Sequence, residues 1–239
     1  FGWEWAIVLA CCMVGSAALI IQPLRTRLDD DRKSAHRVRI NAPGQSVRLV
    51  LTTPRLQPIV LVAFSFGAMQ LSLFAFLVTY LVERVGLDLV TAGLLFAVMQ
   101  GAGFVGRVGW GWVTDRWIGA RPLLAALGAG TIASTAAAIA FSDAWPLAGL
   151  VAGCAALGLT AVGWNGIYLA EVARAVPIDK VGSATGGIMM FTFVGVVLGP
   201  TAFGAIVATT GSYAAAFIAI DALVLVTVLA LAFGRRSDG

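Results

Sequence analysis

Long apolar runs separated by short polar segments dominate this 239-residue chain. A helix needs about 20 apolar residues to cross the hydrocarbon core of a bilayer. By this measure the sequence predicts seven transmembrane helices, and we expect an all-α integral membrane protein with the lipid bilayer around it. The predicted helices cover residues 3–22, 57–82, 91–113, 122–141, 146–172, 181–208 and 213–233. Short connections between the last six make consecutive helices antiparallel neighbours.

Residues 23–55 break this pattern, because they are rich in arginine and aspartate. We predict a solvated basic connector here, whose last part, Val47–Leu51, is amphipathic enough to lie along the membrane surface. The chain thus divides into a first helix (1–22), the connector (23–55), a six-helix bundle (56–233) and a tail (234–239).

The basic residues predict the orientation of the helices. Of the 16 Lys and Arg residues, all except Arg84 and Arg107 fall in the connector, the tail and two short loops at 114–121 and 173–180. These four segments alternate so that they share one side, which the positive-inside rule makes cytoplasmic. We therefore expect a cytoplasmic C-terminus in a multi-pass protein of a plasma membrane, with a bacterial inner membrane as its location.

Composition excludes several other classes of protein. Apolar residues make up 59% of the chain and charged residues 12%, which is typical of membrane proteins. No basic groove is indicated, so nucleic acid is not an expected partner. The sequence contains no phosphate-binding loop, zinc-ligand set or nucleophile elbow, and its sole histidine, His36, lies in the connector. We expect no cofactor, no metal site and no catalytic residue, and therefore no enzymatic activity.

The stretch Gly106–Pro122 combines a glycine-lined helix end with a short charged turn. Glycines leave room for a second backbone, so Gly106, Gly109 and Gly111 are expected to let another helix approach closely. Two GxxxG pairs, Gly149/Gly153 and Gly195/Gly199, predict close helix packing in the same way.

The charged turn resembles the signature loop of the major facilitator superfamily of transporters. Gly111, Asp115 and Arg116 fit the spacing of that loop, and Gly119 and Arg121 fit it with one residue inserted after Arg116.

Other stretches resemble the same superfamily in the same order. Thr160–Ala175 is similar to its tenth helix, and Gly195–Pro200 with Gly211–Tyr213 is similar to its eleventh helix and the loop that follows. The resemblance implies the last helix of a first half, a central loop and a complete second half built from two inverted three-helix repeats, 57–141 and 146–233. It also implies a secondary active transporter that moves a small solute by alternating access. We expect this chain, which begins with Phe1, to be a fragment that works with a missing N-terminal half.

The ends of the third and fifth predicted helices carry a candidate cytoplasmic gate. Glu171 is expected to pair with Arg116 or Arg121, while Asp115 faces the positive N-terminus of a nearby helix. Arg174 belongs to the same group. The alternative is that the basic residues only fix the orientation of the chain.

Five polar or aromatic residues inside predicted helices are candidates to line a substrate cavity, because polar groups in hydrocarbon face the bundle interior or a wet cavity. In the superfamily the corresponding helices, seven, eight and ten, contribute to the central cavity. The candidates are Gln70, Gln100, Trp164, Asn165 and Tyr168. Hydrogen bonds between helices are the alternative role.

Two charged residues also lie inside predicted helices. Arg107 either extends to the membrane surface, joins the charged turn or binds an anionic substrate. Asp221 is either a proton carrier or a structural partner, and the resemblance places its helix at the periphery. The substrate is expected to be a small organic anion or a neutral metabolite.

Two other functions are compatible with seven spanning helices. A retinal protein needs a lysine inside a late helix, but Lys33 and Lys180 both lie in loops. A ligand receptor stays open but leaves the charged turn unexplained. A membrane-embedded enzyme lacks a histidine or a converging carboxylate pair inside the membrane.

Overall fold

The computed structural model describes residues 3–24 and 42–233, and no strand occurs in these two ranges. The chain divides into two compact units, Phe1–Ile40 and Asn41–Gly239. Most of the predicted connector (25–41), the tail (234–239) and residues 1–2 lie outside the described residues.

The first unit contains helix α1 (Trp3–Ile21), which continues into the short 3₁₀ turn η1 (Gln22–Leu24). Every α1 side chain that the structure describes is exposed within this unit. Within the described residues, its apolar stretch Ile7–Ile21 is shorter than the spans of the second unit.

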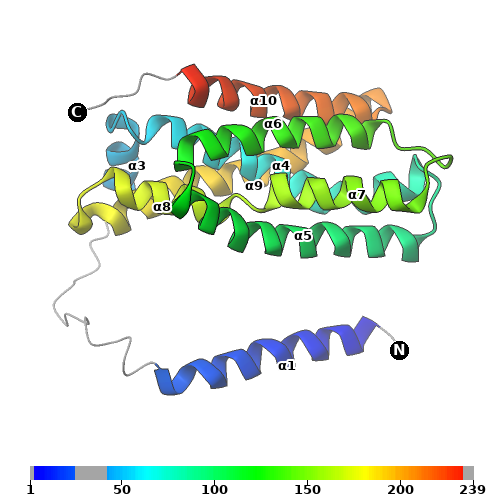
Figure 1. Ribbon diagram of the computed structural model, residues 1–239, viewed down its shortest axis with the longest axis horizontal. Coiled ribbons are helices and arrows are strands. Elements are labelled where there is room, and N and C mark those ends of the chain that lie inside the picture. Colours follow the sequence, from blue (N-terminus) through cyan, green and yellow to red (C-terminus); the bar gives the residue numbers. More distant parts are fainter. Residues whose placement is uncertain (1–2, 25–41, 234–239) are drawn as a thin grey trace. The chain divides into compact units, whose positions relative to one another are not determined.

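The second unit is a bundle of helices that run roughly alongside one another (Figure 1). Its elements are α3 (Ala42–Thr52), α4 (Gln57–Glu83), α5 (Leu89–Arg116), α6 (Ala120–Ile139), α7 (Leu147–Leu157), η2 (Gly158–Val162), α8 (Asn165–Ala175), η3 (Ile178–Lys180), α9 (Val181–Thr210) and α10 (Tyr213–Phe233). Six segments are long and apolar enough to cross a membrane, with α7, η2 and α8 together forming one of them. The predicted all-helical membrane bundle is confirmed.

Two residues mark where long helices begin and end. Asp88 caps α5, since its Oδ1 accepts hydrogen bonds from the backbone amides of Val90 and Thr91 at 3.0 Å. Hydrogen bonding from Thr91, through its side chain first and then its amide, holds the pKa of the exposed Asp88 carboxyl below its ordinary value. At the end of α9, Gly211 takes a left-handed conformation with φ of 67°, which glycine adopts without strain.

The most extensive helix contact joins α4 and α9. A Cβ on Gly195 would overlap the carbonyl oxygen of Phe64, and one on Gly199 would lie 2.5 Å from the Cα of Ala68. The predicted close packing at this glycine pair is confirmed. The prediction is wrong for Gly149 and Gly153, which instead accommodate aromatic side chains from the α6–α7 connection.

The predicted connector ends earlier than residue 55, because residues 42–52 form α3. Val50 and Ser46 of α3 are buried against α9, where a Cβ on Gly187 would lie 2.5 Å from the carbonyl oxygen of Ser46. Val47–Leu51 therefore belongs to a helix packed on the bundle. Gly187 has no side chain, and this leaves room for the α3 backbone. The sequence did not predict this packing because the connector is polar in composition.

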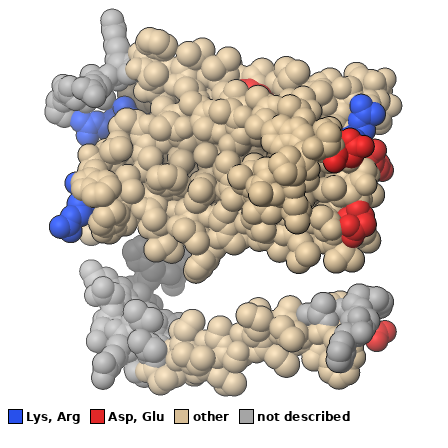
Figure 2. Space-filling view, turned by 45° about the vertical axis from the view of Figure 1, so that its right-hand side comes forward, with Lys and Arg blue, Asp and Glu red and all other residues tan. Residues whose placement is uncertain are grey.

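Charged side chains of the second unit gather mainly at its two ends, with an apolar belt between them (Figure 2). This distribution suits a helix bundle that exposes its middle to hydrocarbon and its ends to water. The cytoplasmic assignment of one end stays a prediction.

Candidate functional site

One end of the bundle carries an ion pair between α6 and α8. Arg121 Nε lies 3.4 Å from Glu171 Oε1, and both side chains are mostly shielded from solvent. Arg121 also donates through Nη2 to the backbone carbonyl of Arg55 at 3.1 Å. Of the two partners expected for Glu171, the structure contains Arg121, while Arg116 is exposed and forms no ion pair within the described residues.

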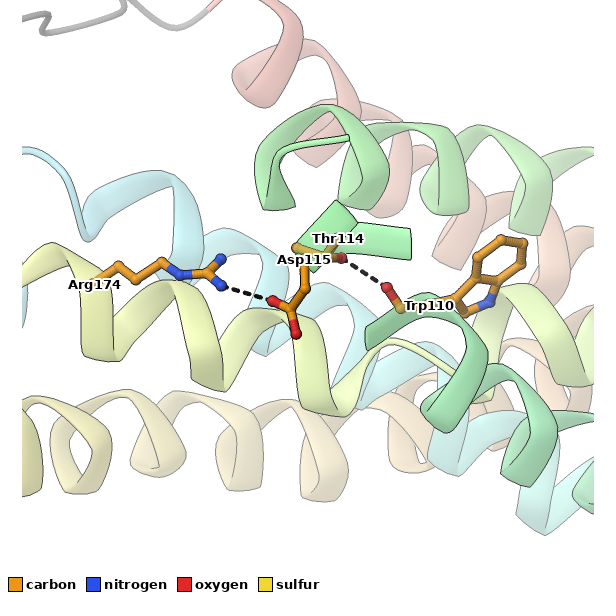
Figure 3. Close-up of polar contacts among 4 residues, drawn as sticks. All are labelled: Trp110, Thr114, Asp115 and Arg174. Atoms are coloured by element: carbon orange, nitrogen blue, oxygen red, sulfur yellow. Dashed lines mark hydrogen bonds and ion pairs between the residues drawn. The ribbon is translucent and has the colours of Figure 1, made fainter. Parts of the chain in front are cut away.

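A second ion pair joins the end of α5 to α8. Arg174 Nη2 donates to Asp115 Oδ1 at 2.8 Å (Figure 3). We expected Asp115 to face a helix N-terminus, and the partner that the structure shows for it is the guanidinium of Arg174. Both side chains are more than half exposed, so this contact contributes little to stability.

The segment predicted as one helix over 146–172 is interrupted near its middle. The α-helical pattern of α7 ends at Leu157, η2 is a five-residue π-helical segment, and α8 starts only at Asn165. Short π segments disturb the regular i to i−4 hydrogen bonds and are frequent at functional sites. The apolar run gave no sign of this interruption.

Four glycines make the crossing of α5 with the interrupted helix possible. A Cβ on Gly158 would overlap the Met99 carbonyl oxygen, and one on Gly163 would lie 3.2 Å from the carbonyl carbon of Gly106. Gly103 and Gly106 of α5 face the same crossing.

The glycines of the charged turn behave differently from one another. The expected close approach is confirmed for Gly106, whose Cβ would lie 3.3 Å from the Cα of Gly163. It is wrong for Gly109 and Gly111, which have open space beside them. Gly119 precedes the first residue of α6.

Side chains bind the carbonyl oxygens of the interrupted helix. Trp110 Nε1 donates to Leu159 O at 2.8 Å, and Arg107 Nε donates to Val162 O at 3.3 Å. Asn165 Nδ2 also donates to Val162 O at 3.3 Å. Backbone polar groups at membrane depth need such partners, because hydrocarbon offers none. Sequence reasoning missed Trp110, although its place one helical turn after Arg107 could have suggested it.

Three of the five cavity candidates form one hydrogen-bonded cluster. Gln70 Oε1 accepts from Trp164 Nε1 at 3.0 Å and from Asn165 Nδ2 at 3.2 Å. Trp164 and Gln70 are buried, while Asn165 is half-buried. Trp164 also packs on Tyr168, with ring centroids 4.6 Å apart. This geometry is that of the alternative role, hydrogen bonding between helices.

A comparison with family profiles identifies the family of the chain. The profile described as Major Facilitator Superfamily matches residues 1–200. The chain belongs to this superfamily. A search of curated proteins found no match. As a member of this superfamily the chain is a membrane transporter, and it contains the charged turn at Gly111–Arg121.

Gln100, inside α5, is the remaining candidate for lining a substrate cavity. Its Oε1 atom is enclosed and has no hydrogen-bond partner among the described residues. A buried oxygen without a partner costs free energy, so this atom is available to a donor that the described residues do not supply.

Asp221 of α10 is buried against α6. Thr135 Oγ1 donates to its Oδ2 at 2.6 Å, while Oδ1 has no partner among the described residues. This contact has the geometry of a structural partner, and the role of proton carrier stays a prediction.

Arg107 is an exposed charged residue in the interior of the membrane-spanning helix α5, away from its two ends. A charge at the centre of a membrane helix costs about 2.5–3.5 kcal/mol on insertion scales. Only its Nε is engaged by a protein group within the described residues, so the two Nη groups of the fork can donate to a ligand.

Proposed function

We propose that this chain provides one half of an alternating-access transporter for a small organic anion, and that it works with a second six-helix half. The observation that carries the substrate class is the exposed Arg107 guanidinium, anchored through Nε on a membrane-spanning helix. A planar guanidinium fork binds carboxylates through two parallel hydrogen bonds. In this proposal the membrane is a bacterial inner membrane and the C-terminus is cytoplasmic.

Uneven burial of the helices supports the proposal that a second six-helix half packs against this bundle. Only 28% of the apolar window of α5 and 17% of that of α9 are buried, against 61% for α4. The exposed face of α9 forms an apolar groove of about 500 Å³, lined by Met190, Phe193, Val194, Val197 and Leu198. Two helices with open faces on one bundle fit a protein that packs a second six-helix bundle there, as the two halves of such transporters do.

The ion pairs at the Arg121 end of the bundle support a gating role. The pair between Arg121 and Glu171 joins α6 to α8, and the pair between Asp115 and Arg174 joins α5 to α8. Alternating access needs contacts that hold one side closed in one state and separate in the other. We propose that these two pairs are such contacts on the cytoplasmic side.

Charge reversal tests the gate in the complete gene product. We expect Glu171→Arg and Arg121→Glu each to lower the initial rate of solute uptake by about five-fold or more, because each brings like charges together and shifts the balance of states. The double variant restores the pair and should return the rate to within about two-fold of the wild type.

Lys180→Glu is the matched control for this experiment, since Lys180 is exposed and has no ion pair within the described residues. It makes the same charge change near the same end of the bundle and should leave uptake unchanged. A double variant as slow as either single variant would refute the gate.

A further inference from the structure

The indole of Trp110 on α5 contacts the π-helical interruption. The Trp110 ring lies against two glycines: a Cβ on Gly163 would lie 2.9 Å from Trp110 Cδ1, and one on Gly106 would lie 3.2 Å from Trp110 Nε1. The indole N–H donates to Leu159 O at 2.8 Å. The hydrogen bond and the space left by the glycines are independent signs that the ring has one defined position.

The same interruption holds Arg107. Its Nε donates to Val162 O, three residues after the carbonyl that Trp110 binds. Leu159 and Val162 both belong to the π segment, so one indole and one guanidinium hold its two ends against α5. A shift of this segment would move the carbonyl to which Arg107 is anchored.

We propose that Trp110 is a positioning residue for anion binding. By holding the Leu159 carbonyl, it fixes the π segment, and the π segment in turn fixes Arg107 with its Nη groups free for a carboxylate. This inference rests on the proposed function, because it takes Arg107 as the group that binds the anion. Trp110 itself does not touch the anion in this arrangement.

The hydrogen bond from Arg107 Nε to Val162 O matters because an unrestrained arginine side chain populates many rotamers. Ordering a long side chain costs conformational entropy, and binding is tighter when this ordering precedes the ligand. A guanidinium held at Nε presents its remaining coplanar donors in one orientation, which favours planar carboxylates. The interrupted helix therefore contributes to selectivity through its backbone.

Amide hydrogen exchange of residues 158–166, in the complete gene product in lipid nanodiscs, tests the structural half of this proposal. Trp110→Phe removes the indole N–H and keeps an aromatic ring. We expect exchange of this segment to rise about 3- to 20-fold, as the loss of one membrane hydrogen bond implies. Trp112→Phe is the matched control, because Trp112 is exposed on the same helix and its ring contacts Trp117. Equal exchange in the two variants would overturn the proposal.

Protection of Arg107 tests the functional half. Phenylglyoxal modifies arginine, and mass spectrometry of the peptide that contains Arg107 reads its extent. Propionate should protect Arg107 and the neutral isostere propionamide should not. In Trp110→Phe, half-maximal protection should need about 3- to 20-fold more propionate, with no change in Trp112→Phe.

The outcomes separate this inference from the function on which it rests. If propionate protects wild-type Arg107 no better than propionamide, the proposed anion binding fails. If propionate protects the wild type but Trp110→Phe matches Trp112→Phe, anion binding stands and the positioning role fails.

A second variant covers the case in which Trp110→Phe does not fold. Gly163→Ala would place a methyl group 2.9 Å from Trp110 Cδ1 and 2.7 Å from Leu159 O, so it disturbs the same hydrogen bond and should also raise the propionate requirement. Gly109→Ala, which has open space beside it, is its control and should behave like the wild type.

Discussion

Arg107→Gln is expected to abolish carboxylate uptake by the complete transporter at low solute concentration, with a loss of at least about 100-fold. Each hydrogen bond to a charged group contributes about 1.5–3 kcal/mol, and the glutamine removes both the charge and the fork. Arg107→Lys keeps the charge but loses the Nε anchor to Val162 O, so a smaller loss of about 10-fold is expected. Initial uptake rates in proteoliposomes, with a panel of labelled carboxylates and their neutral amides, provide the measurement.

Folding should not explain this loss. Removing a charge from a membrane helix relieves an insertion cost, and the glutamine amide can still donate to the Val162 carbonyl. The thermal unfolding midpoint of Arg107→Gln should therefore equal or exceed that of the wild type. Unchanged carboxylate uptake in the variant, or wild-type uptake of neutral solutes alone, would exclude Arg107 as an anion-binding residue.

Gly195→Ala is expected to destabilise the bundle by about 3 kcal/mol, although it adds a single methyl group. That methyl would overlap the carbonyl oxygen of Phe64 and lie 3.1 Å from the backbone nitrogen of Ala68. Backbone atoms of α4 cannot rotate away, so α4 and α9 must separate along their closest contact. Thermal unfolding in detergent micelles, compared with the wild type, measures the effect.

Gly186→Ala is the control on the same helix. Gly186 is exposed and has nothing within 4 Å of its added Cβ, so alanine should be neutral or stabilise α9 by up to about 1 kcal/mol through helix propensity. Equal unfolding midpoints for the two alanine variants would show that the α4–α9 contact is looser than the structure describes.

Most of the helical architecture could be predicted from the sequence, because membrane helices follow from uninterrupted apolar length. The predicted segment 57–82 corresponds to α4, and 213–233 agrees with the bounds of α10. The π segment could not be predicted. Its residues, Gly158–Val162, follow the apolar run like their neighbours, and the groups that contact the interruption, Trp110 and glycines of α5, come from another helix.

Candidate site residues were predictable as a group but not in their roles. Charge and the family resemblance together predicted that Glu171 meets an arginine, and the structure pairs it with Arg121 at the start of α6. A buried glutamine can face a cavity or another polar side chain, and periodicity gives both the same face. Gln70 binds Trp164 and Asn165, a choice that only tertiary packing reveals.

In the proposed function, the α8 surface beside Arg107 lines an aqueous pathway that opens alternately to the two sides of the membrane. Gly166→Cys places a thiol there, since a Cβ at Gly166 lies 3.8 Å from the Arg107 carbonyl oxygen, an ordinary contact. The background replaces Cys11, Cys12 and Cys154 by alanine in the complete gene product. Leu225→Cys, exposed in the middle of α10, is the control for a lipid-facing position.

The decisive measurement is labelling of these thiols by a membrane-impermeant maleimide added to one side of the membrane at a time. The account predicts that Gly166→Cys is labelled from either side, while Leu225→Cys is labelled from neither. If Gly166→Cys resists the reagent from both sides as Leu225→Cys does, the surface beside Arg107 faces lipid or protein, and the alternating-access account is contradicted.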